Sequence, residues 1–237
     1  MNTLSQLLRY GAAIGLMVPM LGTALLVFLV SSNLSWKIVR KWSRMALWFF
    51  GVAVELQYEN ESSHLDQGGV VVGLTQQSLL DPTAGIAGLD RRFLSIWNIE
   101  YALIPFFGWV SFILGWVIIR QRPKQAKRQL EKAAVHASSR GLVFLSAEGK
   151  RSVDGELNPY KKGPVVLALQ AQSPIHPLYI AGSRHCLPPG EWRIQPGIII
   201  LHCLEPIPTE GLTYDDRDTL LAKLRAVGEA AHKHWQG

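Results

Sequence analysis

A short apolar run flanked by glycines, residues 68–73 (Gly-Gly-Val-Val-Val-Gly), most constrains how this chain can fold. A run of this length between turn-forming residues predicts a buried strand. The polar residues Gln76, Ser78 and Asp81 follow it within nine positions. Polar side chains just past the end of a buried strand usually lie at the mouth of a site. We therefore expect residues 74–82 to form part of a functional site.

A second strand-to-loop stretch has the same organisation. Residues 141–146 predict another strand, which leads directly into residues 147–152 (Ala-Glu-Gly-Lys-Arg-Ser). Gly149 lets the backbone approach a ligand closely, and the planar guanidinium of Arg151 matches the oxygens of a phosphate. Glu148 is placed to orient that arginine. This stretch therefore predicts an anion site.

Other segments alternate between helix and strand patterns. Helices are predicted for a basic segment that ends near Ala137, for residues 163–172 and for residues 218–234, and strands for residues 173–180 and 193–204. This alternation favours an α/β fold, a mixed β-sheet flanked by helices on both faces. The basic helix is either a solvated face or a surface that meets anionic lipid.

Composition narrows the class of partner. The chain has 237 residues, a net charge of +6 and 48% hydrophobic residues, and its mean hydropathy is +0.13. A basic protein suits anionic partners, and this apolar content favours a membrane over nucleic acid. A nucleic-acid site is disfavoured because the aromatic residues lie in apolar runs and not among the basic ones. Cys186 and Cys203 lack the spacing of a metal site.

The first 54 residues predict a membrane anchor. Residues 11–30 carry no charge and are long enough to span a bilayer as one helix. A signal peptide and a buried helix are the alternatives. Basic residues follow the run at Lys37, Arg40, Lys41 and Arg44, which disfavours the signal peptide and places the following domain on the cytoplasmic face of the inner (cytoplasmic) membrane. Residues 45–54 are too short to span and predict an interfacial or packed helix, so the globular domain comprises residues 55–237.

Residues 101–119 form a second uncharged stretch. Hydropathy alone predicts a spanning helix here, but Pro105, Gly108 and Gly115 disfavour one. The alternative is an apolar segment that lies against the bilayer or lines a tunnel for an acyl chain.

Together these motifs resemble those of the glycerolipid acyltransferases, the lysophosphatidate acyltransferase family. The first family motif has a histidine and an aspartate separated by four residues; Ser78, Asp81 and Pro82 match it, but Gln76 stands in place of the histidine. The third motif, Pro-Glu-Gly-Thr-Arg-Ser, matches residues 147–152 at four positions. Residues 105–108 (Pro-Phe-Phe-Gly) resemble the second motif, and residues 173–180, with paired prolines, resemble the fourth.

The resemblance implies transfer of a fatty acyl group from acyl-CoA or acyl-carrier protein to a lysophospholipid such as 1-acylglycerol-3-phosphate. It implies no bound cofactor and no metal. Membrane lipids, the lysophospholipid acceptor and the acyl donor are the implied partners, and nucleic acid is not among them. Gln76 and Asp81 take the catalytic positions. The implied substrate-binding residues are Ser78, Glu148, Gly149, Lys150, Arg151, Ser152, Lys161 and Lys162; those on the acyl-chain side are Pro105, Phe106, Phe107 and Gly108.

Replacement of the histidine leaves two functions open. Imidazole can take the proton of an attacking hydroxyl near neutral pH, and a nearby carboxylate can hold its tautomer. The amide of Gln76 forms hydrogen bonds but is not a useful proton acceptor. The chain is therefore either a divergent active acyltransferase or a catalytically silent relative that binds acyl-lipids or acyl carriers. His176 and His64 are not at the spacing of a replacement base.

Overall fold

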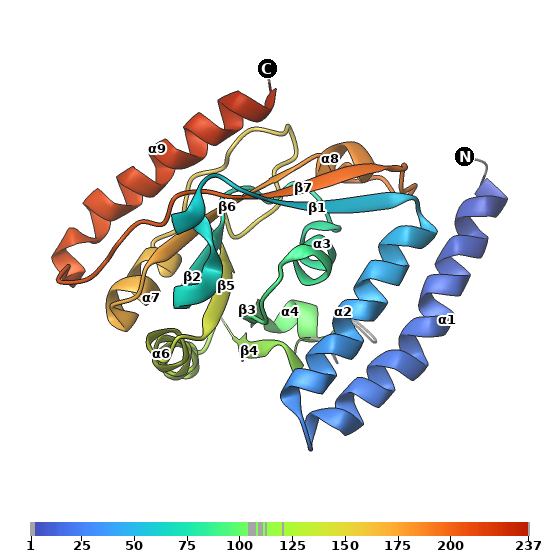
Figure 1. Cartoon of the computed structure of the whole chain (residues 1–237), viewed down its shortest axis with the longest axis horizontal. Helices are drawn as coiled ribbons and strands as arrows, with labels where there is room; N and C mark the ends of the chain where they lie inside the picture. The colour runs from blue at the N-terminus through green and yellow to red at the C-terminus, as the bar shows by residue number, and fades with distance from the viewer. Residues whose placement is uncertain (1–2, 104–107, 109–110, 112, 120, 237) are drawn as a thin grey trace.

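The structure is a computed structural model that describes residues 3–103, 108, 111, 113–119 and 121–236. Its centre is a seven-stranded sheet in the order β1-β7-β6-β2-β5-β3-β4 (Figure 1). Neighbouring strands are parallel except for the antiparallel pair β6 and β7. The strands are β1 (Val52–Tyr58), β2 (Gly69–Gly73), β3 (Leu94–Asn98), β4 (Gly115–Ile118), β5 (Leu142–Ser146), β6 (Ile175–Ala181) and β7 (Gly197–Cys203).

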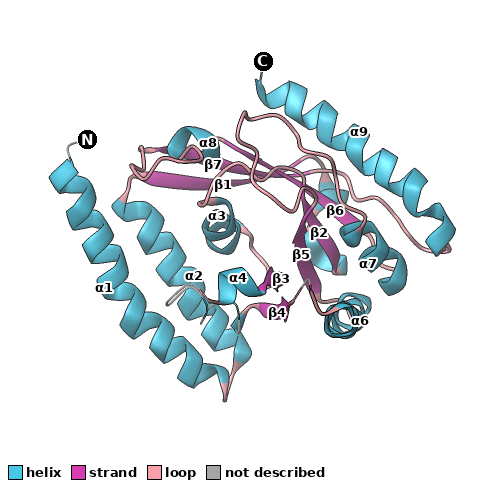
Figure 2. Ribbon diagram, turned by 180° about the vertical axis from the view of Figure 1, so that it is seen from behind, coloured by secondary structure: helices cyan, strands magenta, loops and turns pink. Residues whose placement is uncertain are grey.

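Helices cover both faces of the sheet, which confirms the predicted α/β class (Figures 1 and 2). The helices are α1 (Thr3–Phe28), α2 (Ser32–Phe49), α3 (Asp81–Gly88), α4 (Ile99–Ala102), α6 (Pro123–Ser138), α7 (Gly163–Ala171), α8 (Ser183–Cys186) and α9 (Arg217–Gln236). Short 3-10 helices occupy Glu61–Ser63, Leu65–Gln67 and Tyr214–Asp216.

The valines of β2 show how the two faces are built. Successive side chains of a strand point to opposite faces. Val71 packs in the core beneath α2 and α3, whereas Val70 and Val72 pack in the core beneath α6, α7 and α9. All three valines are fully buried, because helices cover the strand on both sides.

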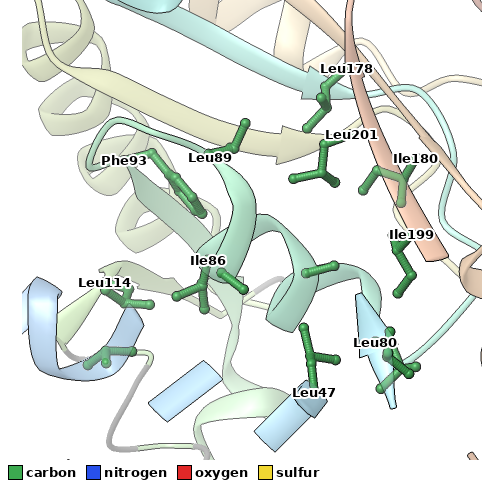
Figure 3. Close-up of a cluster of buried hydrophobic side chains, with 14 of the residues drawn as sticks. Leu47, Leu80, Ile86, Leu89, Phe93, Leu114, Leu178, Ile180, Ile199 and Leu201 are labelled. Atoms are coloured by element: carbon green, nitrogen blue, oxygen red, sulfur yellow. The ribbon is translucent and has the colours of Figure 1, made fainter. Parts of the chain in front are cut away.

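Helix α3 lies between the sheet and α2, as Figure 3 shows. Its residue Ile86 is buried in one core with Leu47 of α2 and Leu201 of β7. This arrangement fixes the N-terminal end of α3, where Asp81 is the first residue of the helix.

Helices α1 and α2 form a hairpin beside the globular domain (Figure 1). The Ser35 hydroxyl donates to the carbonyl of Ala24 at 2.8 Å, and the amide of Gln6 donates to the carbonyl of Ile194 at 2.6 Å. Among the described residues, α1 is the one helix long and apolar enough to cross a membrane by length and composition. It exposes large apolar side chains along its length, among them Leu4, Leu8 and Leu26.

The helix predicted within residues 45–54 is wrong in its second half. Helix α2 ends at Phe49, and Gly51 turns the chain with a φ of +71°. Residues 52–58 then form β1, which pairs with β7 along its whole length. The alternation of Val52, Val54 and Leu56 with solvent-facing positions is the strand signal that the hydropathy of this stretch conceals.

A continuous helix over residues 101–119 is also wrong, because Gly115–Ile118 form β4. A side chain at Gly115 would lie 1.7 Å from the carbonyl oxygen of Ser95, so only glycine permits the pairing of β4 with β3. Pro105, Phe106 and Phe107 lie outside the described residues. Gly108 is buried, and a Cβ there would meet the carbonyl of Ala102 at 2.1 Å.

The packing of α3 on the sheet predicts different effects for its two glycines. An added Cβ at Gly88 would lie 2.5 Å from Leu201 Cδ1 and 2.6 Å from Val54 Cγ1. We expect Gly88→Ala to lower the free energy of unfolding by about 1–3 kcal/mol through overpacking. At Gly85 the nearest atom, Phe93 Cζ, is 4.0 Å away, so Gly85→Ala should be neutral or stabilising by up to about 1 kcal/mol.

Urea unfolding of the two variants in detergent tests this difference. Equal stability of Gly85→Ala and Gly88→Ala would contradict the packing described for α3.

Candidate active site

The candidate site forms where β2 and β5 end. These neighbouring strands are parallel and in register, with Gly73 opposite Ser146. The segments that leave them, residues 74–81 and 147–152, therefore emerge side by side at one edge of the sheet. The amide of Ser152 donates to the carbonyl of Gln76 at 2.7 Å, which joins the two segments directly.

A cavity of about 260 Å³ opens at this edge. Its polar lining includes Gln76, Asp81, Ser146 and Lys161, and Gly149 contributes backbone. Its apolar lining comes from α3, from the residue just before β3 and from strands β3 to β5: Ile86, Phe93, Ile96, Trp97, Ile118, Phe144 and Leu145. One cavity therefore has both polar and apolar lining.

Gln76 is held by three hydrogen bonds. Besides its carbonyl bond to Ser152, its amide N–H donates to Glu148 Oε2 at 2.7 Å. The Ser146 hydroxyl donates to Gln76 Oε1 at 3.0 Å. The side-chain nitrogen Nε2 has no partner within the described part of the chain. Gln76 therefore offers a ligand a hydrogen-bond donor and not a proton acceptor.

Asp81 is buried at the first turn of α3, with 6% of its surface exposed. Its Oδ2 accepts hydrogen bonds from the amides of Gln77 at 2.8 Å and Ser78 at 2.9 Å. Burial raises the pKa of Asp81 to about 6, against the opposing effects of the Ser183 hydroxyl, these two amides and the charge of Arg151.

Several predicted substrate-binding residues do not line the cavity. The Ser78 hydroxyl donates to the carbonyl of Leu187 at 2.9 Å, and the Ser152 hydroxyl donates to Asp154 Oδ1 at 2.9 Å. Lys162 pairs with Asp218 of α9 at 2.6 Å. Each of these side chains has a partner within the protein, and none of the three is among the residues that line the cavity.

Glu148 also differs from its predicted setting. It is fully buried, and its two oxygens accept hydrogen bonds from the amides of Gln76 and Asn158. Burial raises the pKa of Glu148 to about 6, while those amides favour its charged form. The carboxylate therefore holds two backbone segments together, and the described residues show no hydrogen bond or ion pair between it and Arg151.

The remaining predicted residues lie at the cavity or beside it. Gly149 has a φ of +70°, which favours glycine, and it lies against Lys161, whose Cγ would be 3.6 Å from an added Cβ. Arg151 is half-buried and Lys150 is exposed; neither has an ion-pair partner among the described residues. Lys161 thus lines the cavity, and Lys150 and Arg151 directly follow Gly149, which lines it as well.

Two features of the site were not predicted from the sequence: Ser146, which holds the side chain of Gln76, and the aromatic lining supplied by Phe93, Trp97 and Phe144. Ser146 could have been found as the last residue of a predicted strand that precedes a motif. The aromatic residues belong to β3, β5 and a preceding loop, and only the pairing of β3 with β5 brings them together.

Asp81 predicts a pH dependence of stability. Its pKa is about 6 in the folded protein and 3.8 ordinarily, so the folded state binds the proton more tightly. The stability that this provides is fully present below pH ~4 and is lost as the pH rises through about 6. Asp81→Asn keeps an oxygen that can accept from the two amides. We expect its stability relative to wild type to increase by on the order of 3 kcal/mol between pH ~4 and ~7.

Urea unfolding of both proteins across this pH range measures the change. A difference in unfolding free energy that stays constant with pH would contradict the buried, proton-binding state of Asp81.

Comparison with known proteins agrees with this geometry. The family model described as Acyltransferase matches residues 55–181. The 1-acyl-sn-glycerol-3-phosphate acyltransferase of Pseudomonas aeruginosa is 27% identical over 165 residues, which cover 68% of this chain and 63% of that protein. The human 1-acyl-sn-glycerol-3-phosphate acyltransferase alpha is 29% identical over 191 residues, which cover 80% of this chain and 67% of that protein.

The fold matches that of a solved structure. The 1-acyl-sn-glycerophosphate acyltransferase PlsC of Thermotoga maritima superposes with a TM-score of 0.81 at 22% identity, over 100% of this chain and 96% of that chain. The chain spans 60% to 64% of the length of the curated relatives from Caenorhabditis elegans, Limnanthes alba and Pseudomonas aeruginosa. The family model matches more than half of the residues of this chain, which shows that the chain belongs to the acyltransferase family.

Proposed function

We propose that this protein is a membrane-bound acyltransferase. It moves a fatty acyl group from acyl-CoA or acyl-carrier protein to a lysophospholipid such as 1-acylglycerol-3-phosphate. The observation that carries the proposal is a single cavity lined both by Gln76, Asp81 and Lys161 and by aromatic and aliphatic side chains. The names of the similar bacterial and human proteins support the same acceptor class.

The apolar wall suits a fatty acyl chain. Phe93, Trp97 and Phe144 are aromatic, and Ile86, Ile96, Ile118 and Leu145 complete the lining. Binding sites for apolar ligands are mostly apolar with a few polar groups that fix orientation. The acyl chain in this proposal lies along α3 and β3, and its thioester lies near Gln76.

The loop at the cavity mouth suits the phosphate of the acceptor. Lys161 lines the cavity and supplies positive charge there, and Gly149 allows close approach of the backbone. Lys150 and Arg151 follow Gly149 directly in the chain. A planar guanidinium binds two phosphate oxygens at once. In this proposal Arg151 holds the phosphate while the acceptor hydroxyl reaches the thioester.

The chemical step joins the acceptor oxygen to the thioester carbonyl carbon and breaks the carbon–sulfur bond. The proton of the hydroxyl ends on the departing thiol, carried by solvent in the cavity. Gln76 donates a hydrogen bond from Nε2 to orient a reacting oxygen, and Asp81 fixes the turn that carries Gln76 through its bond to the amide of Gln77. Positioning and binding then supply most of the rate.

Helix α1 supports the membrane part of the proposal. It is long and apolar enough for a bilayer and exposes large apolar side chains. Basic residues of α2 follow it at Lys37, Lys41 and Arg44. In this proposal the globular domain therefore lies on the cytoplasmic face, because basic flanks favour that side.

A catalytically silent relative that binds acyl-lipids or acyl carriers is the second candidate function. Gln76 favours it, because the lining of the cavity in the described residues contains no histidine. His176 lies elsewhere on β6, where its Nε2 bonds to the carbonyl of Gly68 at 2.8 Å.

Acyl transfer separates the two candidates. We expect the unmodified protein to transfer radiolabelled acyl groups to lysophosphatidate, and Gln76→His to raise the rate by about 10² because imidazole restores a proton acceptor. Gln77→His is the matched control; its native side chain bonds to Gly155 and not to the cavity, so it should give no gain. Binding of lysophosphatidate without transfer by the unmodified protein would establish the silent relative instead.

The phosphate role of Arg151 has its own test. We expect Arg151→Ala to weaken lysophosphatidate binding about tenfold in titration calorimetry, because a charge-assisted pair of hydrogen bonds is lost. Arg128→Ala, an exposed arginine on α6, is the control and should bind like wild type. Equal affinity of the two variants would remove Arg151 from the site.

A further inference from the structure

Residues 147–162, here called the arginine loop, contain Lys150, Arg151 and Lys161. This loop is neither helix nor strand. Its ends meet where the amide of Lys161 donates to the carbonyl of Ala147 at 2.7 Å. A loop of this length has many conformations of similar energy. Contacts outside the loop must therefore select the one in which Gly149 and Lys161 line the cavity.

Helix α9 supplies such contacts through Arg225. Its Nη1 donates to the carbonyl of Asn158 at 2.7 Å, and both terminal nitrogens lie 3.4 Å from the carbonyl of Leu157. The guanidinium also stacks over the ring of Tyr160, with 4.9 Å between guanidinium carbon and ring centroid. One side chain on α9 thus holds three neighbouring positions of the arginine loop, by charge-assisted hydrogen bonds and a cation–π contact.

Further hydrogen bonds connect the arginine loop to the segment that carries Gln76. Asn158, held by Arg225 through its carbonyl, donates its amide to Glu148 Oε1. The other oxygen of Glu148 accepts from the amide of Gln76 at 2.7 Å. Tyr160 gives a second connection, because its hydroxyl donates to the carbonyl of Leu74 at 2.9 Å, two residues before Gln76.

Two further residues of helix α9, Gly228 and Glu229, favour this contact. A Cβ at Gly228 would lie 2.1 Å from the Tyr160 hydroxyl oxygen, so glycine gives the ring room against the helix. Glu229 accepts from Arg225 Nε at 2.7 Å, which leaves the two terminal nitrogens of the guanidinium facing the loop. Figure 1 shows the yellow loop beside the red helix.

We infer that Arg225 is a positioning residue for the reaction: from α9 it holds the arginine loop, and through Glu148 the backbone of Gln76, in the binding geometry. This inference rests on the proposed function. Arg225 does not line the cavity, so it acts through the loop and not on substrate. The apolar face of α9, with Leu220 and Leu224 buried, packs in the core without it.

The kinetic test compares Arg225→Ala with Arg217→Ala. Arg217 also lies on α9 and stacks over a tyrosine, Tyr214, which is outside the arginine loop. We expect Arg225→Ala to raise the KM for lysophosphatidate about tenfold, the loss expected for charge-assisted hydrogen bonds, and to leave the KM for the acyl donor unchanged. Arg225→Lys should recover part of the loss, and Arg217→Ala should match wild type.

Two kinetic results would overturn the inference. One is an Arg225→Ala variant with the kinetics of Arg217→Ala. The other is a rise of both KM values together with a fall in Tm, which would show general destabilisation.

Amide hydrogen exchange tests the same inference without turnover. Arg225→Ala should speed exchange at the amides of Gln76 and Asn158, which donate to the two oxygens of Glu148, and leave the amides of β6 protected. Unchanged exchange at Gln76 and Asn158 would refute the positioning role. If the protein transfers no acyl groups but these amides respond, the proposed function fails while the connection from α9 to the site stands.

Discussion

The parallel pairing of β2 with β5 is the constraint on which the site depends. It brings Gly73 and Ser146 opposite each other, so the chain leaves both strands at one edge of the sheet. Residues separated by about seventy positions then share hydrogen bonds, as Gln76 does with Ser146 and Glu148. All of β2 and the first two residues of β5 are buried, which makes the register of the pair costly to shift. The polar mouth of the cavity is therefore a consequence of the sheet.

The elements around this pair could be predicted from local patterns, and the sheet edges could not. Strands β2 and β5 are short apolar runs between turn residues, and α6, α7 and α9 have helical spacing. Strand β3 contains polar residues among its apolar ones. Strand β1 begins within the apolar residues 45–54, and β4 lies within the apolar residues 101–119. Gly115 suggested an interrupted helix, but its reason is the approach of the Ser95 backbone, a contact between residues distant in sequence.

The candidate site shows the same division. Gln76, Asp81, Gly149 and Lys161 were predicted and line one cavity. Ser78, Glu148, Ser152 and Lys162 match the family pattern as well, yet they bond within the protein. A motif gives the order of residues along a loop. Buried backbone groups need hydrogen-bond partners. A motif side chain therefore bonds within the protein where the fold leaves such a group without one, and only the other side chains can face the cavity. That information lies in the tertiary structure, as the contacts of Arg225 with the arginine loop also show.

The central claim is that one cavity receives both the acyl chain and the phosphorylated alcohol. A crystal structure of the protein with lysophosphatidate and a non-reactive acyl thioester tests it most directly. We expect the acyl chain against Phe93 and Phe144, the phosphate at Arg151, and the acceptor hydroxyl within hydrogen-bond distance of Gln76 Nε2. Density for the two ligands in separate places, with the cavity beside Gln76 and Asp81 empty, would contradict it.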